Sequence, residues 1–129
     1  MEINLKDIQK KLGKEAREYA NDKEKTARLI NDASDKAEHL DKSGPMEVLY
    51  ERLQLLFGII KDWSNGTYKE VPKGSIVIII IGLIYFLAPV DLIPDFLPGG
   101  FVDDALVLAL VFKQVGSDLE KYKIWKQNR

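Results

Sequence analysis

A run of thirteen apolar residues, IVIIIIGLIYFLA at positions 76–88, constrains the fold of this chain more than any other feature. Its many β-branched residues favour a strand, but a typical strand has only about five or six residues. Ser75, which precedes the run, is a residue type that caps helices, and Pro89, which follows it, stops them. The length and the two boundaries therefore predict a helix over residues 75–88.

The same run raises the question of a membrane-spanning helix. Residues 74–90 are seventeen consecutive uncharged residues, the lower limit of the about 17–25 that a spanning helix needs. A second apolar run, at residues 105–112, has only eight, which is too few to cross a bilayer. A buried core helix, or one that dips into one leaflet, fits these lengths better than a spanning hairpin does. A small integral membrane protein with a helical hairpin remains the alternative.

Apolar residues recur at helical spacing through most of the remaining chain. The pattern predicts an all-α, single-domain bundle of about five helices, with a proline-rich acidic loop between the last two. The domain is predicted to cover residues 1–129, with charged N-terminal helices in 1–44 and an apolar core region in 45–127. The predicted helices lie near residues 3–20, 22–41, 45–64, 75–88 and 103–125.

Local signals predict where some of these helices begin, end and cross. Pro45 suits the first turn of the third helix, and Asn65 and Gly66 supply the left-handed residue that ends it. Val48, Leu55 and Ile59 belong to a second apolar face of this helix, which predicts that it is buried on two sides. Gly116 lies inside the last helix, where glycine costs about 1 kcal/mol relative to alanine, and so suggests a close helix crossing.

Composition excludes several classes of function. The chain has no cysteine and one histidine, which excludes thiolate catalysis and sulfur-ligated zinc and disfavours histidine-centred hydrolysis. Its net charge of −1 gives no basic excess for binding nucleic acid. The first residues, MEINLKDIQKKLGKEA, are charged throughout and lack the apolar segment of a secretory signal. These features predict a cytoplasmic protein that binds no nucleic acid.

Charge is distributed unevenly along the chain. Residues 75–112 contain four aspartates and no basic residue, and three prolines interrupt the same stretch. Carboxylates beside irregular backbone are the ingredients of a magnesium or calcium site. Aspartates also cap helices and turns, and capping is the favoured interpretation for each one alone. Together they need a bound cation, raised pKa values or a lysine from elsewhere in the fold. The four residues are Asp91, Asp95, Asp103 and Asp104.

The stretch YFLAPVDLIPDFLPGGFVDD resembles the signature of the YkvA-like family, a bacterial domain of unknown function. That signature is similar to Y-x-x-S-P-I-D-L-I-P-D-x-x-P followed by G-x-x-D-D. Ala88 replaces the serine of the motif, and the distance from Pro98 to Asp103 is one residue shorter. The resemblance implies membrane association and implies no established reaction. The matching motif residues include Tyr85, Pro89, Asp91, Pro94, Asp95, Pro98, Asp103 and Asp104.

The sequence therefore favours a non-enzymatic interaction or scaffold domain that is soluble or associated with the inner face of the membrane. A membrane surface or a protein is the expected partner, and no catalytic residue or cofactor is assigned. The alternative is a divalent-cation domain, with possible metal-assisted hydrolysis, in which Asp91, Asp95, Asp103 and Asp104 bind magnesium or calcium.

Overall fold

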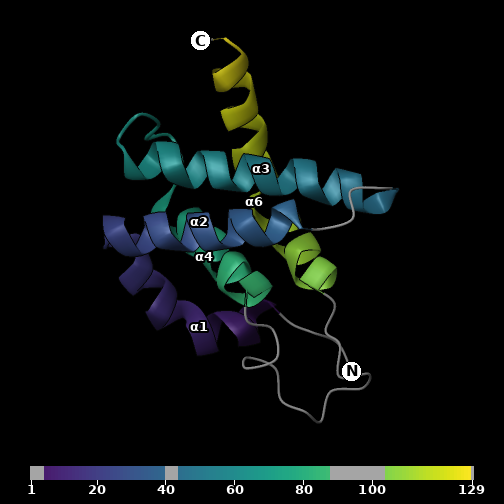
Figure 1. The fold of residues 1–129 in the computed structure, drawn as a ribbon. Helices are drawn as coiled ribbons and strands as arrows, with labels where there is room; N and C mark the ends of the chain where they lie inside the picture. Colours follow the sequence, from purple (N-terminus) through teal and green to yellow (C-terminus); the bar gives the residue numbers. More distant parts are fainter. Residues whose placement is uncertain (1–4, 40–43, 88–103, 129) are drawn as a thin grey trace.

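The computed structural model describes residues 5–39, 44–87 and 104–128 (Figure 1). Within these ranges the chain forms helices and no strand, as the sequence predicts. The helices are α1 (Leu5–Ala20), α2 (Lys23–Glu38), α3 (Pro45–Ser64), α4 (Lys73–Leu87) and α6 (Asp104–Gln127).

The predicted helix of residues 75–88 is confirmed as α4, but its start differs. Backbone N–H groups of Ser75 and Ile76 donate to the carbonyl of Pro72, so the first turn forms at Lys73. Ser75 is therefore inside the helix and is not its cap. Its hydroxyl instead donates to Asp118 of α6 over 2.5 Å.

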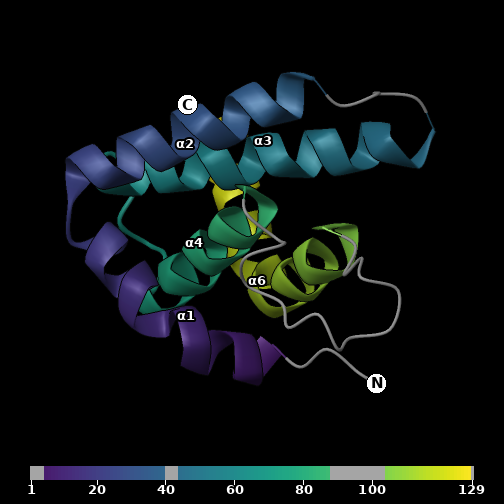
Figure 2. The same cartoon turned by 60° about the horizontal axis from the view of Figure 1, so that its bottom comes forward.

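Helix α4 lies at the centre of the bundle, where α1, α2, α3 and α6 all contact it (Figures 1 and 2). Every residue from Ile76 to Phe86 is buried. A helix that is apolar on all sides is stable in water only when other elements cover its whole circumference. This arrangement explains why the longest apolar run of the sequence has no polar face.

The N-terminal helices contact α4, and α2 buries mostly small residues. The buried residues of α2 are Thr26, Leu29, Ala33 and Ala37.

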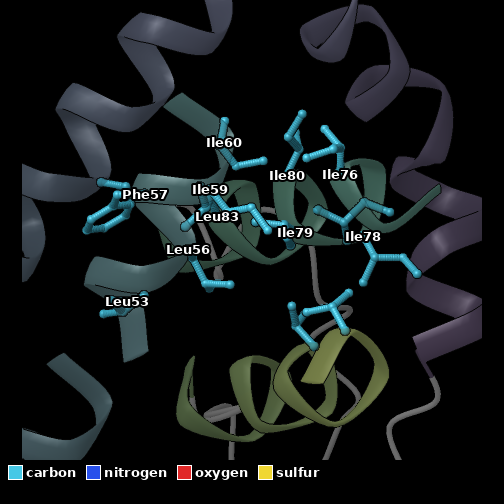
Figure 3. Close-up of a cluster of buried hydrophobic side chains, with 14 of the residues drawn as sticks. Leu53, Leu56, Phe57, Ile59, Ile60, Ile76, Ile78, Ile79, Ile80 and Leu83 are labelled. Atoms are coloured by element: carbon cyan, nitrogen blue, oxygen red, sulfur yellow. The ribbon is translucent and has the colours of Figure 1, made fainter. Parts of the chain in front are cut away.

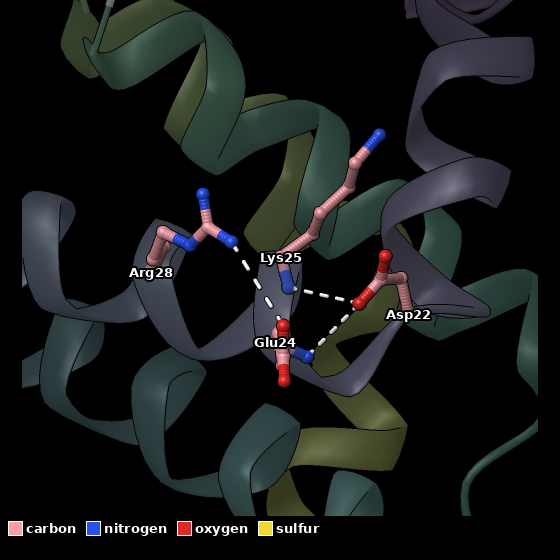
Figure 4. A network of polar contacts seen from close by, with 4 residues as sticks. All are labelled: Asp22, Glu24, Lys25 and Arg28. Carbon is pink, nitrogen blue, oxygen red and sulfur yellow. Dashed lines mark hydrogen bonds and ion pairs between the residues drawn. The ribbon is translucent and has the colours of Figure 1, made fainter.

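The start of α2 is fixed by Asp22, whose carboxylate accepts from the backbone N–H groups of Glu24 and Lys25 over 3.0 and 3.1 Å (Figure 4). This is the usual action of an aspartate N-cap. The Thr26 hydroxyl donates to the Tyr19 carbonyl and links α1 to α2.

Helix α3 packs on α4 with one face. Figure 3 shows its buried side chains, among them Ile59 and Ile60, on the side of α4 that carries Ile80 and Leu83. Its predicted limits are confirmed: Pro45 is its first residue, and Gly66 follows its end with a φ of 77°. The predicted second buried face is wrong at Val48, whose side chain is 52% exposed.

The close crossing of α4 and α6 occurs at Gly82, not at Gly116. A Cβ atom added to Gly82 would lie 2.9 Å from Cγ2 of Val111, whereas one added to Gly116 would meet nothing within 4 Å. The prediction for Gly116 is therefore wrong. The helical spacing could not show that α4 supplies the small residue at this contact.

Candidate functional site

The candidate site is the end of the bundle where α4 leads into the proline and aspartate motif. Two contacts define the geometry of this end, Ser75 with Asp118 and Gly82 with Val111. As the residue number rises along α4, the number of its neighbour on α6 falls, so the two helices are antiparallel. The last turn of α4 and the first turn of α6 therefore lie at the same end of the bundle.

Two of the predicted motif residues lie within the described helices. Tyr85 is fully buried in the last turn of α4. Asp104 is the first residue of α6, where a carboxylate is favourable to the helix dipole. The other motif residues, Pro89, Asp91, Pro94, Asp95, Pro98 and Asp103, lie outside the described residues.

The proposed cation site therefore stays a prediction. Asp91, Asp95 and Asp103 are not described, and the backbone of Asp104 alone does not define a ligand set. Among residues 5–39, 44–87 and 104–128, no group of three or more acidic or histidine side chains could hold a metal ion.

The structure places one basic side chain at this end of α4 that the sequence did not identify. The ammonium group of Lys36, on α2, donates to the backbone carbonyl of Phe86. The same group lies 4.6 Å from the centroid of the Phe86 ring. The last carbonyls of a helix have no partner within the helix and carry the negative end of its dipole. Lys36 satisfies one of these carbonyls with a positive charge.

The position of Lys36 bears on the uneven charge of the sequence. Residues 75–112 contain no basic residue, and Lys36 reaches α4 from fifty residues earlier in the chain. It bonds to Phe86, three residues before Pro89, where the acidic stretch begins. The sequence left open three ways of stabilising the four aspartates together: a bound cation, raised pKa values or a lysine from elsewhere in the fold. Lys36 is a lysine of this kind. The buried Ala33 and Ala37 of α2 allow this helix to lie close to α4.

Comparison with known proteins identifies the family. Residues 75–110 match the family described as Protein of unknown function (DUF1232). The chain is also similar to the Uncharacterized membrane protein YkvA of Bacillus subtilis (strain 168), with 30% identity over 105 residues. That alignment covers 81% of this chain and 97% of the relative. The chain belongs to the YkvA-like family. No solved structure gives a significant match.

Membership of the YkvA-like family agrees with the motif that the sequence analysis identified. The matched segment contains all four aspartates as well as most of α4. The family is one of unknown function, and the relative's name gives no enzymatic activity. The relative is called a membrane protein. In the part of the chain that the structure describes, no helix is both long enough and apolar enough to cross a membrane.

The opposite end of this YkvA-like domain is held by polar and aromatic contacts. The Tyr122 hydroxyl donates to Asp62 over 2.6 Å, while Asp118 accepts from Ser75. The ring of the buried Tyr68 contacts that of Tyr122, with centroids 5.2 Å apart. Burial raises the pKa of Tyr68, and the carboxylates of Glu70 and Asp118 raise it further. The carboxylates of Asp62 and Asp118 bond within the bundle, which indicates a structural role for them.

We expect substitution of Lys36 by methionine to destabilise the domain, because it removes the donor at the end of α4. Methionine keeps much of the aliphatic stem, so the loss measures the hydrogen bond of the ammonium group together with its contact with the Phe86 ring. The free energy of unfolding should fall by about 1–2 kcal/mol. Urea unfolding followed by circular dichroism measures the change.

The matched control for this substitution is Lys14→Met on the exposed face of α1. An exposed substitution of this kind usually changes stability by less than about 0.5 kcal/mol. If the two variants were equally stable, Lys36 would not stabilise the end of α4.

Proposed function

We propose that this protein is a non-enzymatic interaction or scaffold domain that works on the cytoplasmic side, at the inner face of the membrane. The observation that carries the proposal is the burial of α4. Its residues Ile76–Phe86, the most apolar of the chain, pack against four other helices of the same domain. The apolar run is thus used to build the core, and contact with lipid or a partner is left to the outer faces of the bundle.

The name of the Bacillus relative supports the membrane part of this proposal, because the alignment covers nearly all of that protein. The composition supports the non-enzymatic part. The chain lacks cysteine and has only one histidine, and that histidine, His39, is an exposed residue at the end of α2. Its ring is bonded to the Asp35 carbonyl over 2.7 Å, which is an ordinary contact at a helix end.

Fractionation of bacterial cells that produce the protein tests the proposal. A domain held at the membrane surface should sediment with membranes at low salt and be released by an alkaline carbonate wash. A known integral protein and a known soluble protein serve as controls in the same gradient. Retention in the pellet after carbonate treatment would favour the integral hairpin and would contradict the proposal.

Binding of a divalent cation by the aspartates is the second candidate, and the excess of acid in residues 75–112 favours it. If the aspartates only cap helices and turns, magnesium or calcium should raise the melting temperature of the wild type very little. Asp91→Asn and Asp104→Asn should then change it only slightly in chelator, because asparagine caps a turn or helix about as well as aspartate. The charge of Asp104 in the first turn of α6 contributes only about 0.3–1 kcal/mol.

Thermal melts with each ion and with chelator distinguish the two candidates. A rise of several degrees with either ion, lost in both asparagine variants, would establish a cation site. Large destabilisation by asparagine without an ion effect would instead indicate pairing with a basic residue. A melt of the Lys36→Met variant would then show whether Lys36 is that residue.

A further inference from the structure

We propose that the exposed face of the C-terminal turns of α6 docks the protein onto an anionic membrane surface. The face consists of Lys121, Lys123 and Ile124, and we call it the α6 terminal face. The inference rests on the membrane location proposed above. It adds which face of the protein binds the membrane and which lipid charge this face binds.

The first observation is the exposure of Ile124. Its side chain is 56% exposed, and Val48 is the other large hydrophobic residue with comparable exposure among the described residues. Unlike Val48, Ile124 has an exposed lysine on each side of it around the helix, Lys121 and Lys123, and the exposed Glu120 one turn before it. Residues 119–127 contain three lysines and one glutamate. Lys121 and Lys123 are both exposed, and Lys121 lies one turn before Ile124 on the same side of the helix.

The second observation is that the C-terminal turns of α6, which extend past α3, are fixed to the rest of the bundle by side-chain contacts. Figure 1 shows the C-terminal part of α6 extending past α3. The ring of Trp125 lies 4.8 Å from that of Tyr68 and 5.8 Å from that of Tyr122, measured between centroids. The bond from Tyr122 to Asp62 fixes the same turn to α3. The aromatic contacts occupy the inner side of α6, so its outer side presents the lysines and Ile124 in a fixed orientation.

The chemistry of this face fits a membrane better than a protein. Lysine is depleted at the centre of protein interfaces, but here lysines flank the exposed isoleucine. Anionic headgroups attract lysines at their surface, and a single apolar side chain between them can enter the headgroup region.

Flotation of the purified full-length protein with lipid vesicles tests the inference. The wild type should bind vesicles of phosphatidylglycerol and phosphatidylcholine, and should bind phosphatidylcholine alone much more weakly. High salt should weaken the binding, because it screens exposed charges. The test variant is Lys121→Gln/Lys123→Gln/Ile124→Ser. Loss of the two lysines should lower the partition coefficient about 25-fold, or about fivefold for each charge, and loss of Ile124 should lower it further.

The matched control is Lys10→Gln/Lys14→Gln/Val48→Ser, which removes two exposed lysines and one exposed apolar side chain from other faces. Its binding should equal that of the wild type. Thermal melts confirm that both triple variants are folded, as expected for exposed positions.

Each contrary outcome has a separate meaning. If the wild type bound neither kind of vesicle, the membrane location and the docking face would both be wrong, and a protein partner would become the expected occupant. If the wild type bound and the test variant bound equally well, only the docking face would be wrong. Equal loss in the control variant, or equal binding to both kinds of vesicle, would also overturn the assignment of the α6 terminal face.

Discussion

Alanine at any one of four consecutive positions, Ile78, Ile79, Ile80 and Ile81, should lower the free energy of unfolding by about 2–5 kcal/mol. Successive residues of a helix point about 100° apart, so these four side chains sample the whole circumference of α4. All four are buried, with exposed fractions of 8% or less. Each truncation should therefore leave a cavity in the core, whichever neighbouring helix the side chain contacts.

Urea unfolding of the four variants measures the effect, and Val48→Ala serves as the control for an exposed apolar position. The control should change the free energy of unfolding by less than about 0.5 kcal/mol. If one or two of the isoleucine variants behaved like the control, one side of α4 would be open to solvent or lipid. The core position of this helix, and with it the observation that carries the proposed function, would then be contradicted.

Leucine at Gly82 should lower the free energy of unfolding by about 3 kcal/mol, at the upper end of the usual cost of overpacking a core. Even the Cβ atom would lie only 2.9 Å from Cγ2 of Val111. Val111 is fully buried, so its side chain has little space into which to move. The added side chain should push α4 and α6 apart at their crossing.

Gly116→Ala is the control for this substitution, because a Cβ atom there meets nothing within 4 Å. Alanine at this position should raise the free energy of unfolding by about 0.5–1 kcal/mol through its greater helix propensity. Thermal and urea unfolding measure both variants. A stabilising effect at Gly82, or a large loss at Gly116, would show that the crossing lies elsewhere on α6.

The sequence predicted the elements of this fold because the signals for them are local. The apolar run of residues 76–88 was too long for a strand, and the resulting helix ends at Leu87, shortly before Pro89. Pro45 and Gly66 marked the limits of α3 because each suits a backbone geometry that few other residues adopt. Such signals depend on neighbours within one or two turns, and no knowledge of the tertiary arrangement is needed to interpret them.

The contacts between helices were not predictable in the same way. The spacing of apolar residues shows which face of a helix is buried, but not which residue of that face meets another helix. Gly116 and Gly82 were therefore indistinguishable as crossing points until the placement of α4 and α6 was known. For the same reason the bond from Lys36 to the Phe86 carbonyl, between residues fifty positions apart, could not be assigned.

The order of the helices around α4 also affects the protein while it is being synthesised. Helices α1, α2 and α3 leave the ribosome before α4, but α6, which covers α4 at Val111, is made last. Forty residues, 88–127, separate the end of α4 from the end of α6, and their translation takes about 2–8 s at ordinary rates. During this interval one side of an apolar helix is exposed on the nascent chain. The speed of translation through these residues therefore sets how long chaperones and the membrane-insertion machinery can bind it.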